Sequence, residues 1–192
     1  MRVLIGCEES GYIRSEFIRQ GHDAWSCDLL PAADMGRQHI KKDVLRVLET
    51  DHGWDLVICH PPCTALAVSG NRYYAGTRER DEAQNWTENL WQLATRYCRH
   101  VCFEQPVSVL ALPGADKQTL HPWQFRLAEA KTTILHTVGL PPLKTWVTEK
   151  PAIVHEVVWK MGPSEHRSRE RGYLPWLARP MAEQWDSLEI SN

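Results

Sequence analysis

The sequence lacks the features of a membrane or secreted protein. It has 192 residues and no apolar run long enough to span a bilayer. Its first six residues, Met-Arg-Val-Leu-Ile-Gly, have neither the apolar core nor the cleavage site of a signal peptide, and they are typical of a buried strand. We therefore expect a cytoplasmic protein with no membrane partner.

No repeat, low-complexity segment or linker divides the chain. Hydrophobic residues make up 43% of it and charged residues 24%, as in an ordinary globular domain. A chain of this length can bury a substantial core without disulfides or metals. We expect a single domain over residues 1–192, with the core over about 1–140 and an extension over about 141–192 packed on it.

An excess of basic residues is also missing, because the formal net charge is −2. Basic side chains nevertheless gather in two segments, and the ordinary interpretation of either segment alone is a solvated surface. The first segment contains Arg72, Arg78 and Arg80, and the second contains His166, Arg167, Arg169 and Arg171. Composition therefore permits a nucleic-acid enzyme without indicating one.

The six cysteines do not indicate a disulfide framework. They occupy positions 7, 27, 59, 63, 98 and 102, each in or beside an apolar segment, so reduced core residues are the simpler interpretation. A zinc site built from Cys59, His60, Cys63, Cys98 and Cys102 has the wrong spacing, since three residues rather than two separate each cysteine pair. We expect no metal.

Apolar runs typical of strands alternate with segments of helical periodicity. Strands are predicted over about 2–7, 23–28, 54–59, 101–103 and 132–137, and helices over about 12–21, 44–48, 83–97 and 177–188, with a loop over 64–80. This alternation predicts a single Rossmann-like α/β domain, with a mostly parallel sheet and helices on both faces.

Several reactive or charged side chains directly follow predicted strands. They are Glu8, Glu9, Asp28, Cys63 and Glu104. Ligands of parallel sheets bind outside the carboxyl ends of the strands, so these side chains are expected along one edge.

Cys63 follows Pro61 and Pro62, which fix the backbone and would present the thiol rigidly. A thiolate there would be a nucleophile, although free cysteines are often simply buried. Glu104 is followed within two residues by Pro106. In a dry pocket its carboxyl group could donate a proton to a ring nitrogen, and otherwise it is a solvated charge at a strand end.

Two aspartates are candidates for binding an adenosine group. Asp28 ends the second predicted strand, where a carboxylate can accept hydrogen bonds from both ribose hydroxyls. Asp43 precedes the short helix over 44–48, so a cofactor contact and an N-cap explain it equally well.

Taken in order, these segments resemble the DNA (cytosine-5) methyltransferase family. Residues 55–63, Asp-Leu-Val-Ile-Cys-His-Pro-Pro-Cys, with Ser-Gly-Asn at 69–71, resemble its catalytic Pro-Cys segment. Residues 103–106, Phe-Glu-Gln-Pro, resemble its Glu-Asn-Val segment, and residues 4–11 with Asp28 resemble its cofactor loop and ribose-binding acid. The resemblance covers about residues 1–140.

The resemblance implies an S-adenosylmethionine-dependent methyltransferase that modifies C5 of cytosine in DNA through a covalent cysteine adduct. The implied catalytic residues are Cys63, Glu104 and Lys131, the last in place of a family arginine. The implied cofactor residues are Gly6, Glu8, Gly11, Asp28, Asp43 and Pro61, and the implied nucleic-acid contacts are Ser69, Arg72, Arg78 and Arg80.

The chain departs from the family in two respects. Its first loop carries Glu8 and Glu9 where the family is richer in glycine, and there is hardly room for a separate target-recognition domain. It resembles a compact, stand-alone form of the family, and the sequence leaves room for a partner that supplies specificity without indicating one.

Three other functions stay open. An exocyclic-amine methyltransferase typically has an aromatic residue after the paired prolines, where this chain has Cys63. A methyltransferase or related enzyme acting on RNA or a free nucleotide would suit the near-neutral charge. A non-catalytic nucleotide-binding module would need no reactive thiol, so replacing Cys63 would leave its function intact.

Overall fold

The computed structural model describes residues 1–155 and 175–188. Within these ranges no helix combines the length and the apolar character needed to cross a membrane. The basic segment at 166–171 lies outside the described residues.

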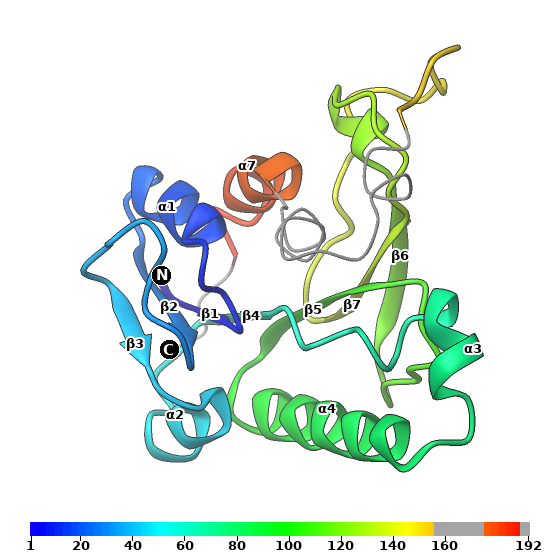
Figure 1. Cartoon of the computed structure of the whole chain (residues 1–192). Helices are drawn as coiled ribbons and strands as arrows, with labels where there is room; N and C mark the ends of the chain where they lie inside the picture. Colours follow the sequence, from blue (N-terminus) through cyan, green and yellow to red (C-terminus); the bar gives the residue numbers. More distant parts are fainter. Residues whose placement is uncertain (156–174, 189–192) are drawn as a thin grey trace.

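One twisted sheet forms the centre of the molecule (Figure 1). Its strand order is β3-β2-β1-β4-β5-β7-β6, and the first five pair in parallel, whereas β7 runs antiparallel to both neighbours. The strands are β1 (Arg2–Gly6), β2 (Asp23–Asp28), β3 (His39–Lys41), β4 (Leu56–Cys59), β5 (His100–Pro106), β6 (Asp116–Leu120) and β7 (Thr133–Val138). The mostly parallel sheet predicted from the sequence is confirmed.

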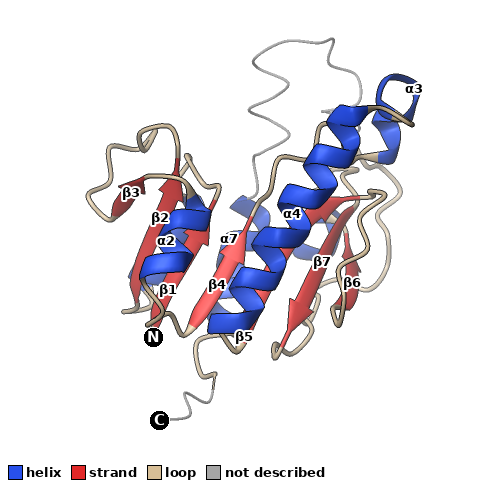
Figure 2. Cartoon of the chain, turned by 90° about the horizontal axis from the view of Figure 1, so that it is seen from below, coloured by secondary structure: helices blue, strands red, loops and turns tan. Residues whose placement is uncertain are grey.

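Helices cover both faces of the sheet, also as predicted (Figure 2). On one face lie α1 (Tyr12–Arg19) and α7 (Pro175–Gln184), and on the other α2 (Val44–Thr50) and α4 (Arg78–Tyr97). Val3 and Ile5 of β1 point into the first core, and Leu4 points into the second. This alternation follows from the period of two along a strand.

Helix α7 completes the core on the α1 face. Its residues Leu177 and Met181 are fully buried in one cluster with Ile13 and Phe17 of α1. Each such side chain contributes about 1.5–3 kcal/mol by leaving water. The helix therefore belongs to the same packed unit as the sheet.

The structure differs from the sequence-based prediction at short or polar elements. Strand β3 has only three residues, and the edge strand β6 has the sequence Asp-Lys-Gln-Thr-Leu, so neither has an apolar pattern to detect. The segment expected as a loop contains the 3₁₀ turn η1 (Val68–Gly70) and the helix α3 (Asn71–Tyr74). Helix α4 starts at Arg78, ahead of its apolar stripe, because the Thr77 side chain caps it by accepting from the Arg80 backbone N–H.

Candidate active site

The ends of three adjacent strands bring the candidate residues to one edge of the sheet. Gly6 of β1 pairs with Cys59 of β4, and Cys59 pairs with Phe103 of β5, so β1 and β4 end level with Phe103, while β5 continues to Pro106. The loops and residues that follow carry the candidate side chains. These are Glu8 after β1, His60 and Cys63 after β4, and Glu104 in the last part of β5.

The Pro-Pro-Cys segment is held from two sides. The buried Gln105 side chain donates from Nε2 to the carbonyl of Pro61 over 2.8 Å, which ties the loop after β4 to β5. The carbonyl of Cys63 accepts from the backbone N–H groups of Leu66 and Ala67 over 3.1 and 2.9 Å. The backbone of Cys63 is therefore fixed, while its side chain is half-buried.

The thiols of the other five cysteines all have a raised pKa. Burial raises the pKa of the thiols of Cys7 and Cys27 to about 12 and that of Cys98 to about 11. It also raises the pKa of Cys59 and Cys102 well above the ordinary range, since both are fully buried. These five thiols stay protonated near neutral pH and are not candidates for a thiolate nucleophile.

Glu104 contacts a histidine that the sequence prediction did not place in the catalytic site. Glu104 is only 8% exposed, and its Oε2 lies 3.4 Å from Nδ1 of His60. The His60 side chain is 12% exposed. The sequence signal for His60 is its position directly before the two prolines, but from the sequence alone this residue is a candidate only for a zinc site.

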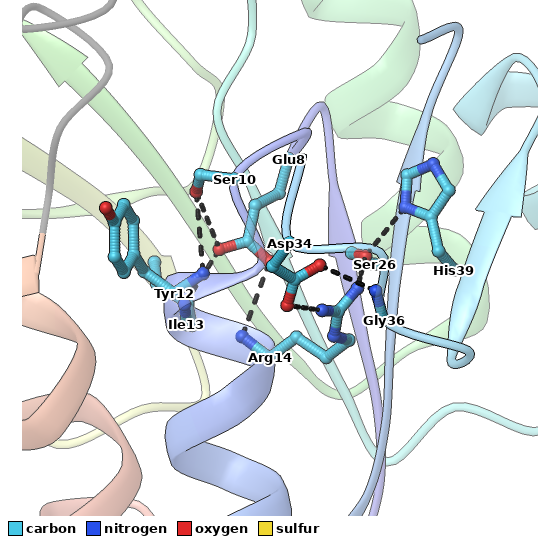
Figure 3. Close-up of polar contacts among 9 residues, drawn as sticks. All are labelled: Glu8, Ser10, Tyr12, Ile13, Arg14, Ser26, Asp34, Gly36 and His39. Atoms are coloured by element: carbon cyan, nitrogen blue, oxygen red, sulfur yellow. Dashed lines mark hydrogen bonds and ion pairs between the residues drawn. The ribbon is translucent and has the colours of Figure 1, made fainter. Parts of the chain in front are cut away.

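Glu8 caps the N-terminus of α1 with its own carboxylate (Figure 3). The carboxylate accepts from the backbone N–H groups of Ile13 and Arg14 over 2.7 and 3.3 Å, and from the hydroxyl group of Ser10 over 3.5 Å. Burial raises the pKa of Glu8, against the effects of His60 and of these N–H donors. The positive end of the α1 dipole is thus occupied by a residue of the chain.

A buried arginine fixes the segment that follows β2 (Figure 3). The Arg14 guanidinium donates to the hydroxyl of Ser26 over 2.7 Å and pairs with Asp34. A Cβ added to Gly11, whose φ is +75°, or to Gly36 would collide with this guanidinium. The two glycines therefore make room for Arg14, which gives Gly11 a structural explanation beside its predicted cofactor contact.

The two predicted adenosine-binding acids lie near the end of β1. Asp28 accepts from the backbone N–H of Leu30 over 2.9 Å, and Asp43 caps α2 by accepting from the backbone N–H of Leu45 over 3.0 Å. The negative charges of both aspartates raise the pKa of Cys7 further, so both aspartates are close to this residue. Two roles were predicted for Asp43, and the structure shows one of them, the N-cap of α2.

Gly6 and Lys131 also lie at this edge of the sheet. A Cβ on Gly6 would lie 2.7 Å from both Cys59 Sγ and Val44 Cγ2, so the backbone is closely packed there. Lys131 is half-buried and lies two residues before Thr133, which pairs with Pro106 at the end of β5. The register thus places Lys131 at the same end of the sheet as Glu104.

The predicted nucleic-acid residues fall into two groups. Ser69, Arg72 and Arg78 are exposed, and Arg78 forms an ion pair with Glu82 over 2.6 Å. A phosphate contact requires an exposed side chain. Arg80 is only 7% exposed, and its side chain is hydrogen-bonded within the chain. Its guanidinium donates to the Ala65 carbonyl and to Asn71 Oδ1, each over 2.7 Å, and to the Ala67 carbonyl over 3.5 Å.

Arg80 is therefore expected to stabilise the fold. Replacing it with alanine removes three hydrogen bonds, two of them to loop carbonyl groups, so the free energy of unfolding should fall by about 1–3 kcal/mol. The matched control is Arg78→Ala, since that side chain is 90% exposed and should contribute less than about 0.5 kcal/mol. Urea denaturation of both variants measures the difference, and equal midpoints would show that the Arg80 hydrogen bonds do not stabilise the protein.

The chain has the fold of known methyltransferases. Its sequence matches no protein-family model and no curated protein. Among solved structures, it is similar to an E. coli prophage protein assigned as a DNA modification methyltransferase (12% identity, TM-score 0.50) and to the Dnmt2 methyltransferase of S. pombe (13% identity, TM-score 0.50). It is also similar to the methyltransferase EhMeth of Entamoeba histolytica (11% identity, TM-score 0.51).

These three likenesses extend over most of this chain but less of the others. They cover 71%, 71% and 84% of this chain, and 46%, 48% and 60% of the respective neighbours. The chain thus spans about half the length of the first two structures. At these identities the likeness shows a shared fold, which confirms the predicted Rossmann-like α/β fold.

Proposed function

We propose that this protein is an S-adenosylmethionine-dependent methyltransferase that methylates C5 of cytosine in DNA, with Cys63 as covalent nucleophile and Glu104 as acid. One observation carries the proposal: the backbone of the Cys63 loop is tied to the strand of Glu104 by the hydrogen bond from Gln105 to Pro61. The shared methyltransferase fold and the sequence resemblance support it further.

Cys63 and Glu104 have complementary tasks in this reaction. C5 of cytosine is a poor nucleophile, because it belongs to an aromatic ring. When the Cys63 thiolate forms a bond to C6, Glu104 gives a proton to N3, so the added electron pair is held as a neutral enamine whose C5 is nucleophilic. After methylation the C5 proton leaves to solvent, the bond from sulfur to C6 breaks, and N3 returns its proton to Glu104.

The residues around the end of β1 fit the cofactor. S-adenosylmethionine would supply an electrophilic methyl group on its sulfonium centre. Asp28 and Asp43 lie beside Cys7, where carboxylates suit ribose hydroxyls and cationic groups, and Asp28 is the residue we expect to bind the ribose. Because Glu8 already occupies the α1 N-terminus, the carboxylate of the cofactor needs another partner.

A cytosine ring cannot be reached inside a duplex, so the base must be flipped out or be unpaired. The exposed residues on α3 and at the start of α4 are suited to contact the strand around it. Arg72 and Arg78 carry charges for phosphate groups, and the Tyr73 ring, 73% exposed, offers a stacking surface. Lys131 would contribute a positive charge at the Glu104 end of the sheet.

The covalent mechanism makes a direct prediction. On an oligonucleotide with 5-fluorocytosine at target sites, C5 bears fluorine instead of the proton that must leave. The enzyme should therefore remain bound in a denaturant-resistant adduct that requires adenosylmethionine. Cys63→Ser should abolish the adduct, and Glu104→Gln should slow its formation about a hundredfold. Gel electrophoresis and mass spectrometry of the trapped peptide measure both.

The controls separate this reaction from its alternatives. Cys7→Ser lies at the same edge of the sheet and should still form the adduct. Transfer of a labelled methyl group to DNA, RNA and free cytidine nucleotides identifies the substrate, and nucleoside analysis identifies the methylated atom. Turnover by Cys63→Ser would rule out the covalent mechanism, and methyl transfer to RNA or nucleotides alone would rule out DNA as the substrate.

A second prediction concerns the cofactor. Asp28→Ala should weaken binding of S-adenosylhomocysteine by about 1–3 kcal/mol, since a charged hydrogen bond to the ribose is removed. Isothermal titration calorimetry of the one-to-one complex measures this. Asp23→Ala, at the other end of β2, is the matched control and should bind normally. An unchanged affinity of Asp28→Ala would remove this residue from the cofactor site.

A third prediction concerns the two exposed arginines. Replacing Arg72 and Arg78 with alanine should weaken DNA binding and reduce the slope of log K against log salt by roughly one unit for each arginine that neutralises a phosphate group. Fluorescence anisotropy titrations at several salt concentrations measure the slope. Arg46→Ala is the control, because this exposed arginine lies on α2. A double variant with the wild-type slope would make these arginines ordinary surface residues.

A further inference from the structure

A largely buried histidine next to Glu104 has no task in the reaction described above. His60 directly follows β4, which lies between β1 and β5 in the sheet (Figure 2). Its backbone N–H donates to the carbonyl of Gly6 over 3.0 Å, so its position is fixed by the end of β1. Three residues later the same loop presents Cys63.

The imidazole ring lies near two carboxyl groups. Nδ1 is 3.4 Å from Glu104 Oε2 on one side. On the other side lies Glu8. Burial raises the pKa of Glu8, and His60 has the largest opposing effect, so the two side chains are close. Nε2 is buried and has no hydrogen-bond partner among residues 1–155 and 175–188. Burial of a polar nitrogen that has no hydrogen bond costs free energy.

The contact with Glu104 has a consequence for the direction of the carboxyl group. If Nδ1 carries the ring proton, it donates to Oε2, and Oε2 is then occupied as an acceptor. The proton of a neutral Glu104 is therefore favoured on Oε1, because the carbonyl-type oxygen of a carboxyl group is the better acceptor, and Oε1 is the oxygen left to address a ring nitrogen. A carboxyl group without this partner could carry the proton on either oxygen and rotate about its terminal bond.

We propose that His60 is a positioning residue that holds the Glu104 carboxyl group by a hydrogen bond from Nδ1–H to Oε2, so that Oε1 faces the cytosine. This role rests on the proposed function. His60 acts through Glu104 and does not itself touch the base. Asparagine carries its amide nitrogen on Cγ, as histidine carries Nδ1, so asparagine can replace the donor. Alanine has no donor. Glutamine places its amide group one atom further out.

The rate of adduct formation with saturating 5-fluorocytosine DNA tests this role. His60→Ala and His60→Gln should slow it about 10- to 100-fold, with unchanged affinity for DNA and S-adenosylhomocysteine, while His60→Asn should stay within about threefold of the wild type. The double variant His60→Ala with Glu104→Gln should be no slower than Glu104→Gln alone, because both changes remove one function. Circular dichroism confirms folding.

A second measurement does not depend on activity. In protein labelled with ¹⁵N-histidine, long-range ¹H–¹⁵N spectra should show His60 protonated on Nδ1, with a resonance that shifts in Glu104→Gln and not in Glu9→Gln, since Glu9 is exposed. An Nε2–H tautomer that ignores Glu104→Gln overturns the proposal. So do equal rates in all three His60 variants, or additive slowing in the double variant. If the wild type forms no adduct, the proposed function fails, and the tautomer still decides whether His60 binds Glu104.

Discussion

The parallel, in-register pairing of β1, β4 and β5 is the constraint on which the candidate site depends. Because Gly6, Cys59 and Phe103 are aligned, the residues that follow them meet at one level. Two buried hydrogen bonds extend this alignment into the loops, one from the His60 backbone to Gly6 and one from Gln105 to Pro61. The site is therefore attached to the central strands of the sheet, which suits catalysis by positioned groups.

Burial has different effects at different points of this edge. It raises the pKa of five thiols, and it leaves the side chains of Glu104 and His60 little exposed to water. The charges that remain buried are each matched, with Glu8 against the α1 N-terminus and Arg14 against Asp34 and Ser26. The exposed charges of Arg72 and Arg78 lie on the helical segment after the Cys63 loop.

The fold could be predicted from the sequence because its central strands are short apolar runs with polar residues at their ends. Residues 2–7 and 54–59 show this pattern. Helices α1 and α4 could be predicted because their apolar residues recur at helical spacing. Strand β6 could not be predicted, because an edge strand exposes most of its side chains and needs no apolar pattern. The same holds for α3, whose four residues depend on the surrounding loop.

Site residues were predictable where a strand end indicated them, as for Cys63 and Glu104. Interactions between distant residues were not, because no local pattern encodes them. Arg80 is close in sequence to two exposed arginines, yet it turns inward to carbonyl groups fifteen and thirteen residues earlier. His60 likewise contacts Glu104, which lies on the neighbouring strand of the sheet. The sequence shows residue types, and only the sheet register shows which of them meet.

The Arg14 guanidinium links positions that are far apart in the chain. It fills the space that a side chain at position 11 or 36 would need, and it requires an acceptor at position 34. These positions are therefore not free to vary independently. In relatives that retain the arginine, both glycines should be retained as well, whereas a lineage without the arginine could accept alanine at 36. The buried cation thus imposes correlated inheritance on the four positions 11, 14, 34 and 36.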